Sequence, residues 1–300
     1  MAIEAIPVIL DTDIGTDIDD TWALAMLLKC PELDLKLVVS DTGDTVYRAE
    51  LMARMLEIAE RTDVPVAVGI DQGCKPERKR QAEWIEDYSL DQYPGEFRSD
   101  GVQALVDAIM QSSRSITLLC IGPMPNIARA LEIEPGIAGR TNFVGMHGSI
   151  NWSHHGAGEQ IAEYNVHADI AACQQVFEAP WKSMTITPLD TCGRIRLTGE
   201  KYAKVRNSDD PLVKAVIDNY RIWAKQQEQW DCATESSVLF DTVAVHLGFS
   251  TKYLKMQQMP IRVDDRGFTV VDPGAQRMNV AIDWQDMAAY EDYLVEQLVG

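Results

Sequence analysis

A short segment near the start of the chain holds five carboxylates within ten residues: Asp11, Asp13, Asp17, Asp19 and Asp20. Like charges this close repel one another, so at neutral pH they need a compensating positive charge. Carboxylate oxygens favour the hard cations Ca²⁺ and Mg²⁺. The segment therefore predicts a divalent cation site. The alternative is a solvated acidic loop whose last two acids only favour the amino end of a helix.

The residues on either side of the acidic segment predict its place in the fold. An apolar run, Val8 to Leu10, precedes it, and a helical pattern from Thr21 to Lys29 follows and stops before Pro31. This order of strand, loop and helix places the acids at the carboxyl end of a first strand. Ligands bind at that end of the strands in open α/β sheets.

Strand and helix patterns alternate through the rest of the chain. Further strands are expected at residues 35–40, 64–68, 116–121, 142–146, 184–187, 255–262, 268–271 and 278–282. Further helices are expected at residues 47–59, 102–110, up to 131, at 167–177, within 198–230, at 241–247 and at 284–298. The alternation predicts one α/β domain over residues 1–300, with a mainly parallel, Rossmann-like sheet and helices on both faces.

Two long loops could border a site. Residues 69–97 are polar and irregular, and both a lid over the site and a plain surface excursion remain open interpretations. Residues 147–162 form a second loop, rich in glycine and histidine.

Composition restricts the partners and the compartment. A formal net charge of −19 argues against nucleic acid or anionic membrane as partners, but not against a neutral small molecule. No run of 18 apolar residues predicts a membrane span, and residues 1–7 lack the basic region of a signal peptide. The six cysteines form no CxxC motif, so we expect reduced thiols in a cytoplasmic protein.

Several separated segments, in this order along the chain, resemble the inosine–uridine-preferring nucleoside hydrolases. They are the acidic loop, Gly43-Asp44 with Arg48-Ala49, residues 61–66, residues 122–128, residues 162–165 with Asp169, residues 189–191, and Phe240-Asp241. The resemblance implies a Ca²⁺-dependent enzyme that cleaves the N-glycosidic bond of ribonucleosides, in nucleoside catabolism and salvage. It also implies a homo-oligomer, either a dimer or a tetramer.

The resemblance implies a role for each matching residue. Asp13 would be a Ca²⁺ ligand and the general base on the metal-bound water. The other Ca²⁺ ligands would be Asp20, Asp241 and the carbonyl of Ile121. The sugar would be held by Asp19, Asp44, Glu163 and Asn165, and Asp17 is the alternative to Asp19. Asp11 would be a supporting residue outside the set that binds the metal and the sugar. Simpler roles stay open: Glu163 and Asn165 as loop hydrogen-bonders, and Asp241 as a helix N-cap.

The leaving base needs a proton or an intrinsically good leaving group, and here the chain departs from the family pattern. Phe240 stands where many members have a histidine that acts as the leaving-group acid. Asp44 stands where a sugar-binding asparagine is common, and the loop at Gly156–Gly158 lacks a further asparagine. Either the loop histidines His147, His154 and His155 supply the acid, or the enzyme depends on the quality of its leaving group. The simpler alternative is that these histidines are solvated loop residues. Base contacts are expected from Trp84, His147, Trp230 and Phe240.

Two other functions fit part of the sequence. Asp11-Thr12-Asp13 followed by Gly15-Thr16 loosely resembles the haloacid dehalogenase-type phosphatases, in which Asp11 would be the nucleophile beside Mg²⁺. A non-catalytic nucleoside- or sugar-binding protein on the same scaffold is the other alternative, motivated by the missing asparagine and histidine.

Overall fold

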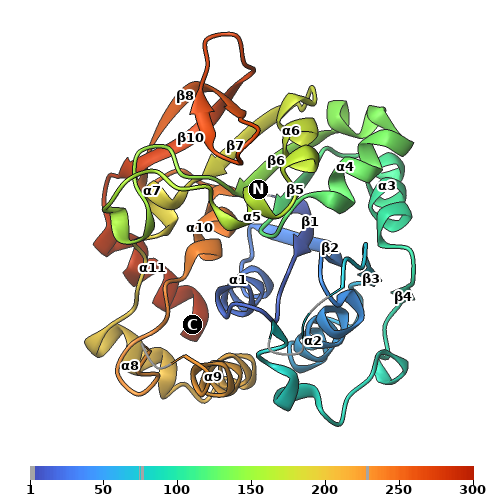
Figure 1. Cartoon of the computed structure of the whole chain (residues 1–300). Coiled ribbons are helices and arrows are strands. Elements are labelled where there is room, and N and C mark those ends of the chain that lie inside the picture. Colours follow the sequence, from blue (N-terminus) through green and yellow to red (C-terminus); the bar gives the residue numbers. More distant parts are fainter. Residues whose placement is uncertain (1–3, 74, 76–77, 228–229) are drawn as a thin grey trace.

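The computed structural model describes residues 4–73, 75, 78–227 and 230–300 (Figure 1). A ten-stranded sheet runs through the centre in the order β4-β3-β2-β1-β5-β6-β7-β10-β8-β9. The strands are β1 (Ile6–Thr12), β2 (Leu33–Ser40), β3 (Val66–Val68), β4 (Phe97–Arg98), β5 (Ile116–Cys120), β6 (Thr141–Met146), β7 (Ser183–Thr187), β8 (Leu254–Val263), β9 (Thr269–Val271) and β10 (Arg277–Trp284). Neighbours from β4 to β10 pair in parallel, and β8 and β9 pair antiparallel. The mainly parallel α/β prediction is confirmed.

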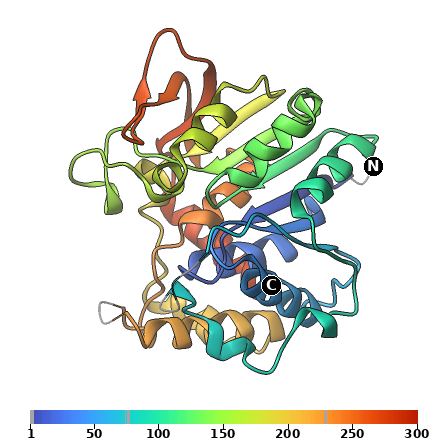
Figure 2. The same ribbon diagram turned by 45° about the vertical axis from the view of Figure 1, so that its right-hand side comes forward.

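Helices cover both faces of the sheet. They are α1 (Asp19–Leu28), α2 (Thr45–Ile58), α3 (Gly101–Gln111), α4 (Pro125–Ile133), α5 (Tyr164–Ala168), α6 (Ile170–Glu178), α7 (Leu189–Cys192), α8 (Gly199–Arg206), α9 (Pro211–Ala224), α10 (Phe240–Leu247) and α11 (Met287–Val299). Short 3-10 turns are η2 (Ala82–Ile85), η3 (Leu90–Gln92), η4 (Pro135–Arg140) and η5 (His154–Gly156). Figure 2 shows α3, α4 and α6 on one side of the strands and α1, α2 and α9 on the other.

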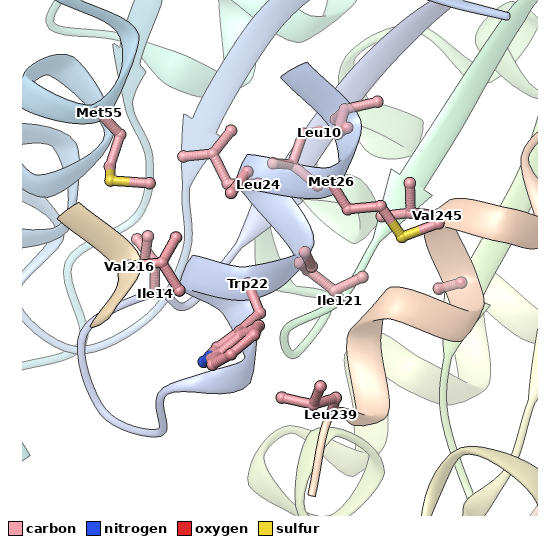
Figure 3. Close-up of a cluster of buried hydrophobic side chains, with 14 of the residues drawn as sticks. Leu10, Ile14, Trp22, Leu24, Met26, Met55, Ile121, Val216, Leu239 and Val245 are labelled. Carbon is pink, nitrogen blue, oxygen red and sulfur yellow. The ribbon is translucent and has the colours of Figure 1, made fainter. Parts of the chain in front are cut away.

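Alternate residues of the central strands feed two separate hydrophobic cores. Val8 and Leu10 of β1 join the core on the α1 face, whereas Ile9 joins the core beneath α3, α4 and α6. Figure 3 shows the first core, in which Trp22 of α1 lies near Leu239, the residue just before α10. Helix α1 is buried along nearly its whole length between the sheet and helices α9, α10 and α11. The acidic loop that leads into α1 is therefore anchored in the core.

The strand order changes direction at one point in the sheet. From β1 the chain builds outward through β2 and β3, then returns to add β5 on the other side of β1. The loops that follow β1 and β5 thus diverge and leave a crevice at the carboxyl end of the sheet. The acidic loop and Ile121 lie at that switch point.

Three parts of the chain differ from the predicted pattern or extend it. The single helix expected at residues 167–177 is two helices, because the Asp169 side chain accepts a hydrogen bond from the Ala172 amide and starts α6 there. Among the described residues of 69–97, the named elements are η2, η3 and the first residue of β4. The five described cysteines are free thiols, and Cys74 lies outside the described residues. Across the described chain, no helix has the length and apolar character needed to cross a membrane.

Candidate active site

A buried arginine from α2 fixes the shape of the acidic loop. Arg48, 3% exposed, donates hydrogen bonds to the carbonyls of Thr42, Asp13 and Ile14 and to the Thr16 hydroxyl. Its guanidinium also lies 3.8 Å from the Asp13 carboxylate. One cation thus satisfies the loop backbone and offsets part of the charge of Asp13.

Other contacts hold the same loop from two further directions. Gly15 has φ +107°, and a side chain there would collide with Tyr47, whose hydroxyl donates to the Gly15 carbonyl at 3.0 Å. The Arg80 amide donates to the same carbonyl at 3.0 Å, and the Trp223 indole donates to the Thr16 carbonyl at 3.1 Å. Part of residues 69–97 is therefore built into the site as a support.

Three buried carboxylates come together where α1 and α10 begin. Oxygens of Asp19, Asp20 and Asp241 lie within 4.8 Å of one another, and each residue is at most 6% exposed. Asp19 and Asp241 hydrogen-bond each other, and the Thr12 hydroxyl donates to Asp20 at 2.5 Å. Burial first, then the neighbouring acids, raise the pKa of Asp20 and Asp241 well above the usual range and that of Asp19 to about 7. Such a group of hard oxygen donors fits a divalent cation.

Asp241 is not the N-cap of its helix. Leu239 holds the cap position, and Asp241 lies inside the first turn of α10. Its carboxylate is thus free of a capping role and points to the other two acids. The helix amino end adds a partial positive charge beside the cluster.

Asp13 lies on the wall of the same cavity but outside this trio. Gly122 of the loop after β5 lets it approach closely, since a Cβ there would lie 2.9 Å from the Asp13 amide nitrogen and 3.1 Å from its carboxylate. Burial raises the pKa of Asp13, and the Arg48 guanidinium opposes that rise. Asp13 is thus a buried acid on the wall of the cavity, outside the trio.

The cavity at the switch point has a volume of about 280 Å³. Most of the residues predicted for the site line it: Asp13, Asp17, Asp19, Asp20, Ile121, Glu163, Asn165, Phe240 and Asp241. Its wall also includes His154, Tyr164 and His167. Segments from both halves of the chain, far apart in sequence, thus meet at one crevice.

Glu163 and Asn165 both make the structural hydrogen bonds that the simpler interpretation expected. Glu163 caps α5 and accepts from the amides of Gly148, Asn165 and Val166. Burial raises its pKa to about 7. The Asn165 side-chain nitrogen donates to the carbonyls of Ile121, at 3.1 Å, and Met146, at 3.0 Å. These bonds orient the cavity wall, and the Ile121 carbonyl keeps a second lone pair for a cation.

Asp17 and Asp19 occupy different environments. The Asp17 carboxylate is mostly exposed and forms an ion pair with Arg80 at 2.9 Å. Asp19 is buried and belongs to the trio. Of the two acids, Asp19 is therefore the one that lies with Asp20 and Asp241.

Asp44 and Trp84 lie away from the cavity, and neither is among the described residues that line it. Asp44 caps α2 and pairs with Lys79. Burial by itself would raise the pKa of Asp44. The hydrogen bonds from Lys79 and the Tyr47 amide outweigh burial, so the pKa is lowered overall. Trp84 packs beneath the Arg54 guanidinium, 4.8 Å from the ring centre. The predicted sugar contact of Asp44 and base contact of Trp84 are not supported, because both side chains join residues 69–97 to helix α2 instead.

His147 is not positioned as an acid or a base contact. Its ring is fully buried between Phe143 and Phe177 in the second core, and Nε2 lies 3.0 Å from the Gly122 carbonyl. Burial lowers its pKa to about 3. A neutral histidine with no path to the cavity supports the loop after β5 and cannot protonate a ligand.

Asp11 supports the site from behind, as expected. It is fully buried, and its carboxylate accepts from the Asn126 side chain at 2.9 Å. Burial raises its pKa to about 7. Asp11 is not among the described residues that line the cavity, so the structure gives no support to it as the nucleophile of the phosphatase alternative.

Two supporting residues had no clear signal in the sequence. Asn126 bridges the Asp11 carboxylate, the Ser40 carbonyl and the Ile70 amide. Asp41, directly after β2, is fully buried, and its carboxylate oxygens have no hydrogen-bond partner among the described residues. Burial and then the charges of Asp11 and Asp13 raise its pKa well above the usual range. Polar residues that immediately follow a buried strand, or that start the helix after it, were the available clue.

Known proteins resemble this chain over almost its whole length. Residues 8–291 match the family model described as inosine-uridine preferring nucleoside hydrolase. The pyrimidine-specific ribonucleoside hydrolase RihA of Enterobacter sp. (strain 638) is 28% identical, with 98% of each chain covered. The solved plant nucleoside hydrolase PpNRh1 has a TM-score of 0.84 at 20% identity, covering 99% of this chain and 100% of its own. A purine-preferring ribonucleoside hydrolase from Gardnerella vaginalis has a TM-score of 0.78 at 22% identity, covering 98% of each chain.

Proposed function

Because the chain belongs to the inosine-uridine preferring nucleoside hydrolase family, we propose that it hydrolyses the N-glycosidic bond of ribonucleosides to free base and ribose, with Ca²⁺ as cofactor. The observation that carries the proposal is the buried trio of Asp19, Asp20 and Asp241 on a cavity at the switch point of the sheet. The family makes the protein an N-glycosidase; the ion, the residue roles and the substrate are our inference.

The donor set fits Ca²⁺. The residues that would hold it are Asp20, Asp241 and Asp13 together with the Ile121 carbonyl, and all four line the cavity. They offer only oxygen, and Ca²⁺ takes six to eight oxygen ligands in a flexible arrangement. When bound, the ion would make a coordinated water more acidic and accept the ribose hydroxyls.

The side chains of the chain itself supply the remaining chemistry. Asp13 takes a proton from the attacking water, and Arg48 keeps the carboxylate in place from the side away from the cavity. Asp19 accepts hydrogen bonds from the ribose hydroxyls, and Asn165 and Glu163 shape the wall beside the sugar. The bond breaks through an oxocarbenium-like transition state, whose positive charge the buried carboxylates stabilise electrostatically.

The identity of the base is a separate question. The relatives carry names that specify pyrimidine or purine preference, so family membership fixes the reaction and leaves the base open. We propose a cytoplasmic enzyme, which the five free cysteines support, and a homo-oligomer, dimer or tetramer, for sedimentation to test.

The test is a ribose-release screen over purine and pyrimidine nucleosides, with added Ca²⁺ and with a chelator. Ribose release that requires Ca²⁺ is the expected result. Tight nucleoside binding without any release of ribose, at high enzyme concentration, would favour the non-catalytic alternative. A reaction that proceeds equally with chelator would remove Ca²⁺ from the proposal.

A further inference from the structure

The reaction has a second requirement that the residues named so far do not meet. When the glycosidic bond breaks, the electron pair goes to the ring nitrogen of the base, and a natural base leaves slowly unless that nitrogen gains a proton. Phe240, beside the metal-site residue Asp241, has no proton to give. The inference that follows rests on the proposed function and concerns the source of that proton.

A second cavity adjoins the first on the side of Phe240. It has a volume of about 230 Å³ and shares Asp17, Asp19, His154 and Phe240 with the first cavity. Its own wall includes two aromatic residues, Trp223 and Trp230. A flat heteroaromatic ring stacks favourably on such rings, so a sugar held by the acidic trio would direct its base into this second cavity.

His154 lies at the junction of the two cavities. It is the one described histidine that lines both. Its ring meets Phe240 edge-on, with 5.8 Å between centroids and 77° between planes. The side chain is exposed, so it can regain a proton from solvent after each turnover.

The loop that carries His154 is anchored in place. Asp190 accepts from the amides of Ile150 and Asn151, both at 2.8 Å. Gln160 donates to the carbonyl of Ser149 in the same loop and to that of Thr269 in β9. His155 adopts φ +65°, an unusual conformation for a residue other than glycine, and its amide donates to the Gly193 carbonyl at 3.0 Å. A turn held in this conformation directs the preceding side chain, His154, to the cavity junction.

The other described histidines do not fit the role. His147 is sealed in the core. His155 lines only the second cavity, and His167 lines only the first. His246 is buried in an aromatic cluster with Phe249 and Tyr253, on the far end of α10.

We propose that His154 donates the proton to the leaving base, in place of the histidine that Phe240 lacks. As the C1′–N bond breaks, its electron pair moves to the base nitrogen, which takes the proton from His154. The water oxygen bonds to C1′ and gives its proton to Asp13. That proton passes to solvent, which re-protonates His154, so each cycle consumes one water. Partial desolvation and then His155 lower the pKa of His154, and the Asp17 carboxylate opposes that shift.

The test compares a natural nucleoside with 4-nitrophenyl riboside, whose leaving group needs no proton. His154→Ala should lower kcat on the nucleoside by about 10²–10⁴-fold and leave the aryl riboside rate close to that of the wild type. His154→Gln, which keeps the size and polarity of the side chain, should show the same split. The matched control is Glu159→Gln, an exposed residue of the same loop that is not among the described residues lining either cavity, and it should leave both rates nearly unchanged.

A rescue variant sharpens the result. Adding Phe240→His to His154→Ala should restore part of the nucleoside rate without changing the aryl riboside rate. Equal losses on both substrates, or no loss on either, would overturn the assignment while leaving the hydrolase function intact. A wild-type protein that releases ribose from neither substrate would instead refute the proposed function, and this inference with it.

Discussion

Replacing Asp241 by asparagine should change stability in opposite directions with and without Ca²⁺. In the metal-free protein the three carboxylates of the trio repel one another, so neutralising one of them should stabilise the fold. In the presence of Ca²⁺ the same change removes a ligand, so the bound protein should lose stability relative to the wild type. Asparagine keeps the size of the side chain, which limits packing effects.

The magnitude follows from the spacing of the acids. Two unit charges 4.8 Å apart repel by about 3.5 kcal/mol at an effective dielectric constant of 20. Losing the charge of Asp241 removes two such repulsions. Proton uptake already relieves much of this repulsion, because the pKa of Asp19 is raised to about 7 and those of Asp20 and Asp241 are raised well above their usual range. We therefore expect a net gain of about 2 kcal/mol, or about 4 °C in Tm, for the metal-free variant.

The assay is thermal unfolding in chelator and over a Ca²⁺ titration, followed by circular dichroism. Replacing a residue that supports the ligands without binding the metal typically lowers metal affinity by roughly 10–100-fold. The Asp241 variant should lose more Ca²⁺ affinity than that. Asp100→Asn is the control, since it removes one charge at the cap of α3 and asparagine caps equally well. A variant with lower Tm in chelator than the wild type, and an unchanged Ca²⁺ response, would refute the reasoning.

Three further changes test the rest of the site. Asp13→Asn should lower kcat by about 10²-fold or more while leaving Tm in chelator near that of the wild type, and near-normal kcat would remove Asp13 as the base. Arg48→Met should cost about 3–5 kcal/mol in denaturant unfolding, because it leaves Asp13 and several loop carbonyls buried without their partner. In chelator, stability should fall as pH rises from about 4 to about 7, since Asp11 and Asp19 have folded pKa values of about 7 and bind protons that the unfolded chain has released. Denaturant unfolding across that range measures the change of stability with pH. A stability that stays constant or rises with pH would show that the charges of Asp11 and Asp19 are already offset in the folded protein.

Local sequence patterns were sufficient for most of the fold. The runs at Val8–Leu10 and Ile116–Ile121 are apolar, short and bounded by turn residues, so they predicted β1 and β5 within a few residues. The break at Asp169 was missed because the apolar spacing continues through it. Only the contact between its carboxylate and the Ala172 amide separates α5 from α6.

Contacts between distant segments account for what the sequence did not predict in the site. Asp44 was expected at the sugar because it stands where the family commonly has a sugar-binding asparagine, but the turn after β2 places it as a cap, paired with Lys79. Nothing in the loop from residue 147 distinguishes a buried histidine from an exposed one. That difference arises when His147 packs against Phe177 and His154 meets Phe240.

The many bonds to the acidic loop also bear on how an ion would bind. Arg48, Tyr47, Arg80 and Trp223 hold the loop backbone through contacts in which the carboxylates of the trio take no part. The ligands are therefore arranged before any ion arrives, and binding pays little conformational entropy. In small metal-folded domains the affinity for the ion is folding free energy. In this protein the affinity would reflect mainly charge and dehydration, and the ion would exchange while the protein stays folded.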